Sequence, residues 1–372
     1  MNRRNCLKRL AVTLPTLALP TGWAETIERS GKEAADIGII AKKFMTEHSV
    51  PGLSVAFAHR ERLVFSAAYG LADEAKGEKL TSNHTFRIAS VSKPITAVAI
   101  FALIEQGKLK LGDKVFGEGG LLAVKSLDKL PPKVSDVTVQ HLLTHTAGGW
   151  GNERADPMFQ HPELRHSDLI ARTLQDHPLE HDPGTSYSYS NFGYCLLGRI
   201  IEEVTGKGYE EHVQQAVLDR CGIRTMRIAG NTLADRAPGE VVYHGRGGED
   251  PYGMNVRRMD AHGGWLGRPE DLVKFLIRVD TRVEVPDILK EPSLKQMFQA
   301  SAANPGYACG WAVNAAPNRW HAGSLPGTTT IAVTTASGMS WAGFTNARGP
   351  DINAALDRMM WEMAKAVPAW NA

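Results

Sequence analysis

Two hydrophobic periodicities follow one another near the start of the chain. Within residues 31–48, the apolar side chains from Ile37 to Met45 recur at i, i+3, i+7 and i+8, which places them on one face of a predicted amphipathic helix. The next two apolar segments, Leu53–His59 and Leu63–Tyr69, are short and are separated by a charged turn. This pattern predicts a β-hairpin.

The middle of the chain, about residues 108–270, is irregular, and its periodic parts have a helical period. A helix is predicted over Ser90–Gln106, where Gly107 can end it, and another over Phe192–Val204. Residues 235–268 are rich in Gly, Arg and Asp and predict loops, before Pro269 opens a further helix. The C-terminal part predicts short strands at Tyr307–Val313, Thr328–Thr334 and Ser340–Phe344, and a closing helix at Ile352–Ala366.

Predicted strands therefore lie at both ends of the chain, with helices between them. A chain of 372 residues is long enough for one large domain or two closely packed ones. We predict an α/β (α+β) fold with one antiparallel sheet flanked by helices. Residues 25–90 and 270–372 would form this part, and residues 91–269 a mostly helical inserted domain.

The N-terminus has the features of a signal peptide. Basic residues from Arg3 to Arg9 precede a short apolar stretch, and Gly22 and Ala24 supply small residues at a cleavage point. We expect residues 1–24 to be removed and the protein to be periplasmic or secreted. The pair Arg3-Arg4 leaves both twin-arginine and general export open.

Charge and composition exclude several classes of function. Residues 1–24 hold four basic residues and no acidic ones, so their removal turns the net charge of +2 into −2. That balance does not favour nucleic acid as a partner, and no apolar stretch reaches the roughly 20 residues of a membrane span. Histidines and cysteines do not cluster in a metal-binding pattern, and no nucleotide-binding loop is present, so we expect no metal or cofactor. Three cysteines, Cys195, Cys221 and Cys309, remain in the mature chain and require no disulfide.

The first candidate for chemistry is Ser90, three residues before Lys93 at the start of a predicted helix. Residues three apart share a helix face, so Lys93 can activate the Ser90 hydroxyl as a nucleophile. The alternative is a capping serine beside a solvated lysine. A second Ser-x-x-Lys, from Ser126 to Lys129, precedes a double proline, and we interpret it as a surface segment.

The second candidate is the segment Tyr189-Ser190-Asn191, just before a helix. A tyrosine near a lysine can exist partly as phenolate and can move protons to a leaving group. An asparagine can hold a substrate amide with both a donor and an acceptor. The alternative is a short strand ending in Asn191 as a helix cap.

The third candidate is His321-Ala322-Gly323-Ser324, at the edge of the C-terminal strands. A strand glycine such as Gly323 permits close approach of a ligand, and the backbone N–H of Ser324 could join that of Ser90 in an oxyanion hole. The alternative is an edge-strand histidine that leads into a turn, and His262-Gly263-Gly264 matches the same His-x-Gly pattern.

In this order the three segments resemble the β-lactamase-like, penicillin-recognising serine hydrolases. The branch is that of class C β-lactamases, D-alanyl-D-alanine carboxypeptidases, D-aminopeptidases and related esterases. The resemblance extends over about residues 33–366. It includes the approach to the serine at 85–90, the segment 142–149, and the residues around the third segment at 310–311 and 325–328. It implies the fold of β-lactamases and transpeptidases, with the site between the two parts.

The resemblance also implies a role for each residue. Ser90 would be the nucleophile, Lys93 its base or proton partner, and Tyr189 the general acid/base toward the leaving group. Asn191 would contact the acyl side chain of the substrate, and Gly323 and Ser324 would line the oxyanion side. Whether Lys93 or Tyr189 takes the first proton stays open.

One residue departs from the pattern, because His321 stands where many relatives carry lysine. Lysine is a permanent cation, whereas histidine charges only in mild acid, so we expect substrates with a carboxylate to react better below about pH 6.5. We therefore predict a hydrolase acting on an ester or a D-amino-acid peptide. The alternatives are a true β-lactamase or penicillin-binding carboxypeptidase acting on β-lactams, and a non-catalytic protein that binds cell-wall peptides.

Overall fold

The computed structural model describes residues 31–124, 127, 129–367 and 370. The predicted N-terminal helix and hairpin are confirmed as α1 (Lys32–Glu47), β1 (Gly52–His59) and β2 (Arg62–Asp73). The predicted signal peptide, residues 1–24, lies outside the described residues, and so does Ser126 of the second Ser-x-x-Lys.

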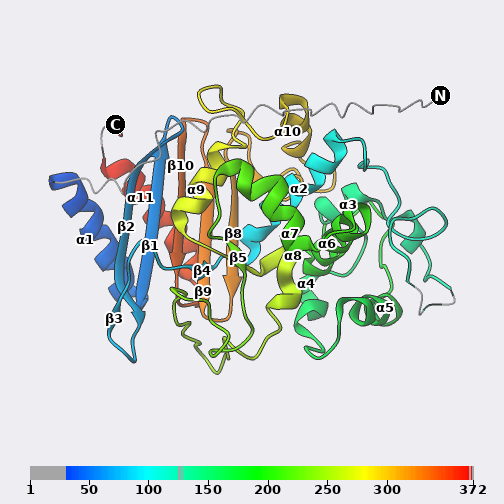
Figure 1. Ribbon diagram of the computed structural model, residues 1–372, viewed down its shortest axis with the longest axis horizontal. Helices are drawn as coiled ribbons and strands as arrows, with labels where there is room; N and C mark the ends of the chain where they lie inside the picture. The colour runs from blue at the N-terminus through cyan, green and yellow to red at the C-terminus, as the bar shows by residue number, and fades with distance from the viewer. Residues whose placement is uncertain (1–30, 125–126, 128, 368–369, 371–372) are drawn as a thin grey trace, which may run out of the picture.

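Strands from both ends of the chain form one antiparallel sheet (Figure 1). In the described part of the chain this sheet has seven strands in the order β3-β2-β1-β10-β9-β8-β7, so that β1 pairs with β10. The hairpin of the N-terminal part thus lies beside the last strand of the C-terminal part, as the sequence predicts. The remaining strands of the sheet are β3 (Glu78–Lys79), β7 (Ala312–Val313), β8 (Arg319–Leu325), β9 (Thr328–Thr334) and β10 (Met339–Thr345).

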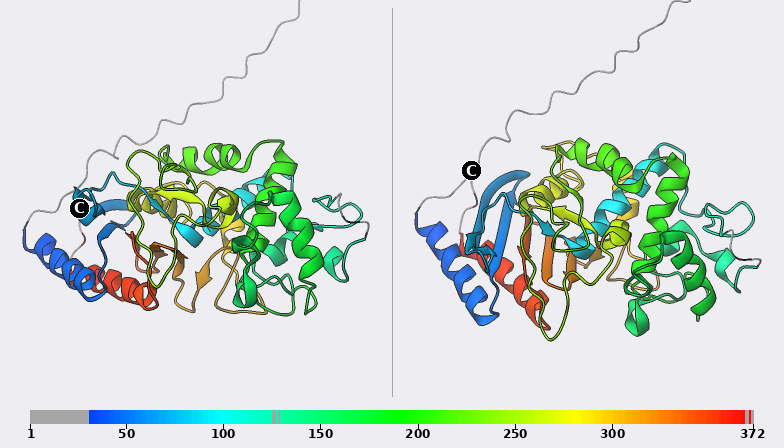
Figure 2. Two further views of the ribbon diagram at one scale, coloured as in Figure 1. Left: turned by 90° about the horizontal axis from the view of Figure 1, so that it is seen from below. Right: turned by 60° about the horizontal axis from the view of Figure 1, so that its bottom comes forward.

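Helices cover both faces of this sheet, which explains why β9 and β10 are buried along their whole length. On one face, α1 and the C-terminal helix α11 (Ile352–Ala366) lie side by side (Figure 2). They bury an apolar layer that includes Phe57, Trp341 and Met360. On the other face, α9 (Pro269–Ile277) packs against β1 and β10.

The helical part lies beyond α9 and is built around α2 (Ser92–Glu105). From Ser92 to Leu103 every residue of α2 is buried, so it is an interior helix rather than an amphipathic surface helix. Around it lie α3 (Val139–Leu143), α4 (Asn152–Ala155), α5 (His166–Asp176), α6 (Asn191–Thr205), α7 (Tyr209–Val213), α8 (Asp260–Gly263) and α10 (Glu291–Met297). A second, small sheet has the order β4-β6-β5, with β4 (Phe86–Arg87), β5 (Arg227–Ile228) and β6 (Trp265–Gly267).

Three expectations about the elements need correction. The predicted strand Tyr307–Val313 is reduced to β7, whereas β8 was not predicted as a strand. Residues 235–268, predicted as loops, end in α8 and β6. The division into two domains at residues 90/91 and 269/270 stays a prediction. Within the described residues, no helix combines the length and the hydropathy that crossing a membrane requires.

Candidate active site

Ser90 lies in a tight turn that joins the small sheet to α2. The turn is one 3-10 segment, Ala89–Val91, and Ala89 has a φ of 49°, in the left-handed region. The preceding residue, Ile88, is fixed on both sides. Its N–H donates to the Trp265 carbonyl at 2.9 Å, and its carbonyl accepts from Thr330 Oγ1 at 2.7 Å. These bonds hold a strained turn in place, as is common where a side chain must be presented to a cleft.

Lys93 lies three residues after Ser90, as the spacing predicts, and is fully buried. Its Nζ donates to Ser90 Oγ at 3.0 Å, to Asn191 Oδ1 at 2.7 Å and to the His262 carbonyl at 3.1 Å. Burial lowers the pKa of Lys93 to about 7, and the charge of Asp156 opposes that shift. At neutral pH a substantial fraction of Lys93 is therefore the uncharged amine, which can accept a proton.

Tyr189 is hydrogen-bonded to the Ser90 side chain, and its ring centroid lies 4.7 Å from Lys93 Nζ. Burial raises the pKa of Tyr189, and the bond to Ser90 opposes this only in part. The expected partial phenolate is therefore wrong, because desolvation disfavours the anion more than its neighbours stabilise it. Tyr189 is a neutral phenol beside the Ser90 hydroxyl.

Asn191 is the first residue of α6 rather than its cap. The capping residue is Ser190, whose Oγ accepts from the Gly193 N–H at 3.0 Å. The Asn191 amide is oriented on both sides, since its Oδ1 faces Lys93 and its Nδ2 donates to Asp156 Oδ2 at 2.6 Å. The alternative of Asn191 as a helix cap is therefore wrong.

The third predicted segment lies on β8, which approaches the Ser90 turn closely. A Cβ on Gly323 would overlap with the Ile88 carbonyl oxygen and with Thr330 Oγ1. Only glycine allows this approach without displacing backbone. It brings Ser324 to the same cleft as Ser90.

These residues converge on one cleft of about 440 Å³. Ser90, Tyr189, Asn191, His321, Gly323 and Ser324 all line it, and Lys93 lies buried behind Ser90. The competing His262-Gly263-Gly264 match is not in the lining, although the His262 carbonyl holds Lys93.

Two residues of the cleft were missed by sequence reasoning. Asp156 accepts a hydrogen bond from Asn191 Nδ2 and so orients the Asn191 amide. Tyr307 Oη is hydrogen-bonded to His321 Nε2 at 3.0 Å and to His145 Nε2 at 3.1 Å. Asp156 lies in an irregular segment with no motif, so no local signal marks it. Tyr307 precedes Gly310-Trp311, a segment of the family resemblance, and that proximity was the available signal.

The expectation that His321 charges in mild acid is wrong. Its side chain is buried, its Nδ1 lies 2.7 Å from the Ala322 carbonyl oxygen, and Lys93 is nearby. Burial, together with the charge of Lys93, lowers the pKa of His321 to about 3. His321 is therefore a neutral imidazole throughout the range in which a free histidine titrates.

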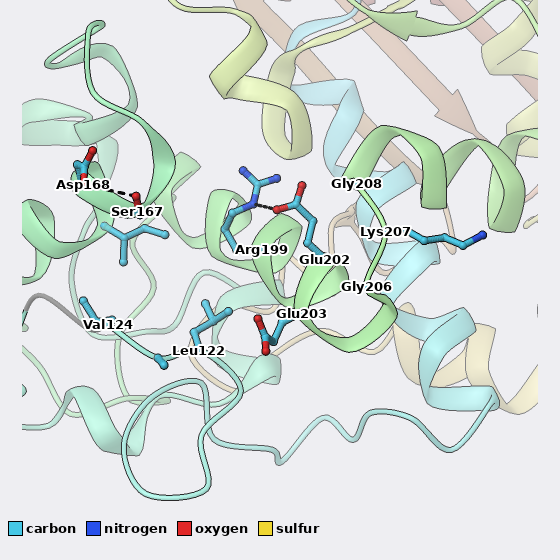
Figure 3. Close-up of a pocket in the computed structure, with 12 residues that line it drawn as sticks. Leu122, Val124, Ser167, Asp168, Arg199, Glu202, Glu203, Gly206, Lys207 and Gly208 are labelled. Carbon is cyan, nitrogen blue, oxygen red and sulfur yellow. Dashed lines mark hydrogen bonds and ion pairs between the residues drawn. The ribbon is translucent and has the colours of Figure 1, made fainter.

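A second hollow, of about 700 Å³, lies on the helical part between α5, α6 and residues 122–124 (Figure 3). Arg199 lies at its centre and is paired with Glu202 at 2.8 Å and with Asp260 at 2.7 Å. None of the predicted site residues lines this hollow. We therefore place the candidate active site at the cleft of Ser90.

Within the described ranges, no group of three His, Cys, Asp or Glu side chains is placed to hold a metal ion. Cys195, Cys221 and Cys309 are free thiols, and burial raises the pKa of each to about 12. Such thiols are poor nucleophiles, and the lining of the cleft includes the Ser90 hydroxyl but none of these three residues.

The antiparallel sheet, the helical part and a serine–lysine pair at their junction define a serine hydrolase of the penicillin-recognising class. The β-lactamase family model matches residues 40–363, and the chain belongs to this family. It is 30% identical over 249 residues to the esterase EstB of Burkholderia gladioli, covering 62% of this chain and 60% of that protein. It is 25% identical over 297 residues to penicillin-binding protein 4* of Bacillus subtilis, covering 73% of this chain and 62% of that protein.

The matched regions thus span less than two thirds of these curated relatives. Among solved structures, the D-amino acid amidase of Ochrobactrum anthropi, complexed with L-phenylalanine amide, superposes with a TM-score of 0.72 at 22% identity. That match covers 90% of this chain and 99% of the amidase. At this level of identity the likeness shows the fold, and the predicted fold class is confirmed.

Proposed function

We propose that this protein is an exported serine hydrolase that cleaves an ester or amide bond through an acyl-enzyme on Ser90. The observation that carries the proposal is the 3.0 Å bond between Lys93 Nζ and Ser90 Oγ, at a site whose burial lowers the pKa of Lys93 to about 7. A serine hydroxyl needs a base within hydrogen-bond reach, and an uncharged lysine supplies one.

In the acylation step, Ser90 Oγ forms a bond to the carbonyl carbon of the substrate, and its proton passes to the neutral amine of Lys93. Tyr189 remains a phenol because burial raises its pKa, which favours Lys93 as the first proton acceptor. When the bond to the leaving group breaks, the Tyr189 O–H donates the proton that the leaving alcohol or amine requires. Tyr189 regains a proton directly from the protonated Lys93, whose Nζ lies beside the Tyr189 ring, and Lys93 becomes the neutral amine again.

Water completes the cycle. It attacks the acyl carbon and gives its proton to Lys93. Lys93 returns this proton to Ser90 Oγ as the Ser90–acyl bond breaks, which releases the carboxylic acid and restores both the hydroxyl and the neutral amine. The backbone N–H groups of Ser90 and Ser324 would stabilise the oxyanion in both steps, because the two residues line the same cleft.

The substrate class follows from the charge of the cleft. A neutral His321 offers no cation for a carboxylate, and the guanidinium of Arg348, which also lines the cleft, is already paired with Glu249. This disfavours a true β-lactamase or penicillin-binding carboxypeptidase and favours an esterase or a D-amino-acid peptidase. The esterase relative supports the same choice. A non-catalytic peptide-binding protein is the remaining alternative, and the bonded Ser90, Lys93 and Tyr189 argue against it.

The test compares the mature protein with Ser90→Ala against a nitrophenyl ester, a D-amino-acid amide and a chromogenic cephalosporin. Hydrolysis and the intact mass of the protein are both followed. The matched control is Ser92→Ala, because the Ser92 hydroxyl is buried in the same segment without a hydrogen-bond partner. We expect an acyl adduct and turnover that Ser90→Ala abolishes and Ser92→Ala retains. Turnover that persists in Ser90→Ala would disprove the assignment, and no reaction with any substrate would favour the binding protein.

A further inference from the structure

Two histidines and a tyrosine form a hydrogen-bond chain in the wall of the Ser90 cleft. Tyr307 Oη lies 3.1 Å from His145 Nε2 and 3.0 Å from His321 Nε2. Backbone groups close both ends, because the Ser190 N–H donates to His145 Nδ1 at 3.1 Å and His321 Nδ1 lies 2.7 Å from the Ala322 carbonyl oxygen. The three side chains are buried.

The backbone partners determine the direction of every bond. An N–H only donates, so His145 Nδ1 carries no proton, and a carbonyl oxygen only accepts, so His321 Nδ1 carries one. Neutral His145 then has its proton on Nε2 and donates it to Tyr307. The single hydroxyl proton of Tyr307 is left for His321 Nε2 or for Tyr194 Oη, whose own proton goes to the Leu143 carbonyl. Only donation to His321 gives a partner to both ring nitrogens of His321.

We propose that Tyr307 is a positioning residue that holds His321 as the neutral Nδ1–H tautomer and so makes this wall of the cleft select leaving groups without a carboxylate. Both ring nitrogens of His321 are occupied within the protein. His321 therefore shapes the cleft and offers no hydrogen-bond donor to a substrate. The part that concerns substrates rests on the proposed function, whereas the tautomer does not.

The surroundings of the chain oppose protonation of His321. A second proton, on Nε2, would face a Tyr307 oxygen that already accepts from His145, and it would force the Tyr307 hydroxyl to turn away. Among the described residues, Lys93, Tyr187, Tyr189 and Tyr194 face the chain, and Asp156 and Arg348 also line the cleft. The Asp156 carboxylate is bonded to Asn191 Nδ2, and the Arg348 guanidinium is paired with Glu249. Neither acts on His321 as a partner, so an imidazolium there would have no counter-ion.

The first experiment reads the tautomers directly, by NMR of the protein labelled with 15N-histidine, between pH 5 and 8. The signals are assigned with His145→Gln and His321→Gln. We expect His321 protonated on Nδ1 and His145 protonated on Nε2 across the range. A charged His321 at pH 6, or a proton on its Nε2, would overturn the proposal without any measurement of activity.

The second experiment uses Tyr307→Phe, which keeps the ring and removes the hydroxyl. We expect His321 to lose its fixed tautomer and to titrate at higher pH. The matched control, Tyr187→Phe, alters a neighbouring tyrosine outside the chain and should leave the signals of His321 unchanged. Unchanged signals in Tyr307→Phe would contradict the proposal, and if that variant does not fold, the tautomers of the unmodified protein decide.

The third experiment compares two esters that differ only in a carboxylate or a carboxamide on the leaving alcohol. For the unmodified protein we expect the ratio of their kcat/KM values to favour the carboxamide and to stay constant from pH 5 to 8. In Tyr307→Phe the carboxylate ester should gain about tenfold at pH 5, the effect of one added charge in a partly solvated cleft. If the unmodified protein hydrolysed the carboxylate ester relatively faster at low pH, the proposed specificity would be refuted. Absence of all hydrolysis would instead refute the proposed function.

Discussion

The two walls of the cleft each bury one basic side chain, with opposite results. On the helical wall, burial lowers the pKa of Lys93 from its ordinary 10.5 to about 7, and the charge of Asp156 opposes this shift. On the sheet wall, burial and then the charge of Lys93 lower the pKa of His321 from its ordinary 6.5 to about 3. The two shifts are of similar size, so the higher ordinary pKa of a lysine is what leaves Lys93, and not His321, able to exchange protons at neutral pH.

The largest expected effect tests the helical wall. Lys93→Arg keeps the positive charge but cannot deprotonate, so a mechanism that needs a neutral base should lose about 10²- to 10⁴-fold in kcat/KM. Ester hydrolysis under steady-state conditions measures the loss, and Lys114→Arg, at an exposed lysine paired with Asp136, is the control. Activity retained in Lys93→Arg would mean that only the charge of Lys93 matters.

The next prediction tests the position of β8 in the sheet wall, and it changes no charge. In Gly323→Ala the added Cβ would push β8 away from the Ile88 carbonyl and from the Ser90 turn. A displacement of about 1 Å at an oxyanion donor can cost on the order of 10²-fold in rate. We expect kcat to fall more than KM rises, measured with the same ester. Full activity would show that Ser324 contributes no donor to the transition state.

The residues of the cleft differ in how far the sequence could predict them. Ser90 and Lys93, like Tyr189 and Asn191, are neighbours within one short segment, so their spacing made them candidates, and the family resemblance gave them their expected roles. Asp156 and Tyr307 reach the cleft from irregular segments through long-range packing, and no periodicity marks such residues. The neutral state of His321 was missed for the same reason, since burial and the nearness of Lys93 are properties of the folded chain. The pairing of the N-terminal hairpin with the C-terminal strands was predicted, whereas β8 was not, because Gly323 interrupts a strand pattern.

The smallest expected effect comes from removing the negative charge of Asp156 near Lys93. Asp156→Asn removes the negative charge but keeps an oxygen that can accept from Asn191 Nδ2. The negative charge favours protonated Lys93, so its loss should lower the pKa of Lys93 further. Because the neutral amine is the active form, kcat/KM rises with pH through this pKa. The acid limb of the profile should therefore move to lower pH, by about one unit.

The measurement is the pH profile of kcat/KM for a neutral ester between pH 5 and 9. Asp136→Asn, at an exposed carboxylate, serves as the control and should leave the limb in place. Burial raises the pKa of Asp156, while its bonds from Asn191 and Met158 and the charge of Lys93 oppose this shift. Asp156 must be ionised for the effect to appear. An acid limb that stays in place, with an alkaline limb that moves to lower pH, would show that Lys93 works as a cation.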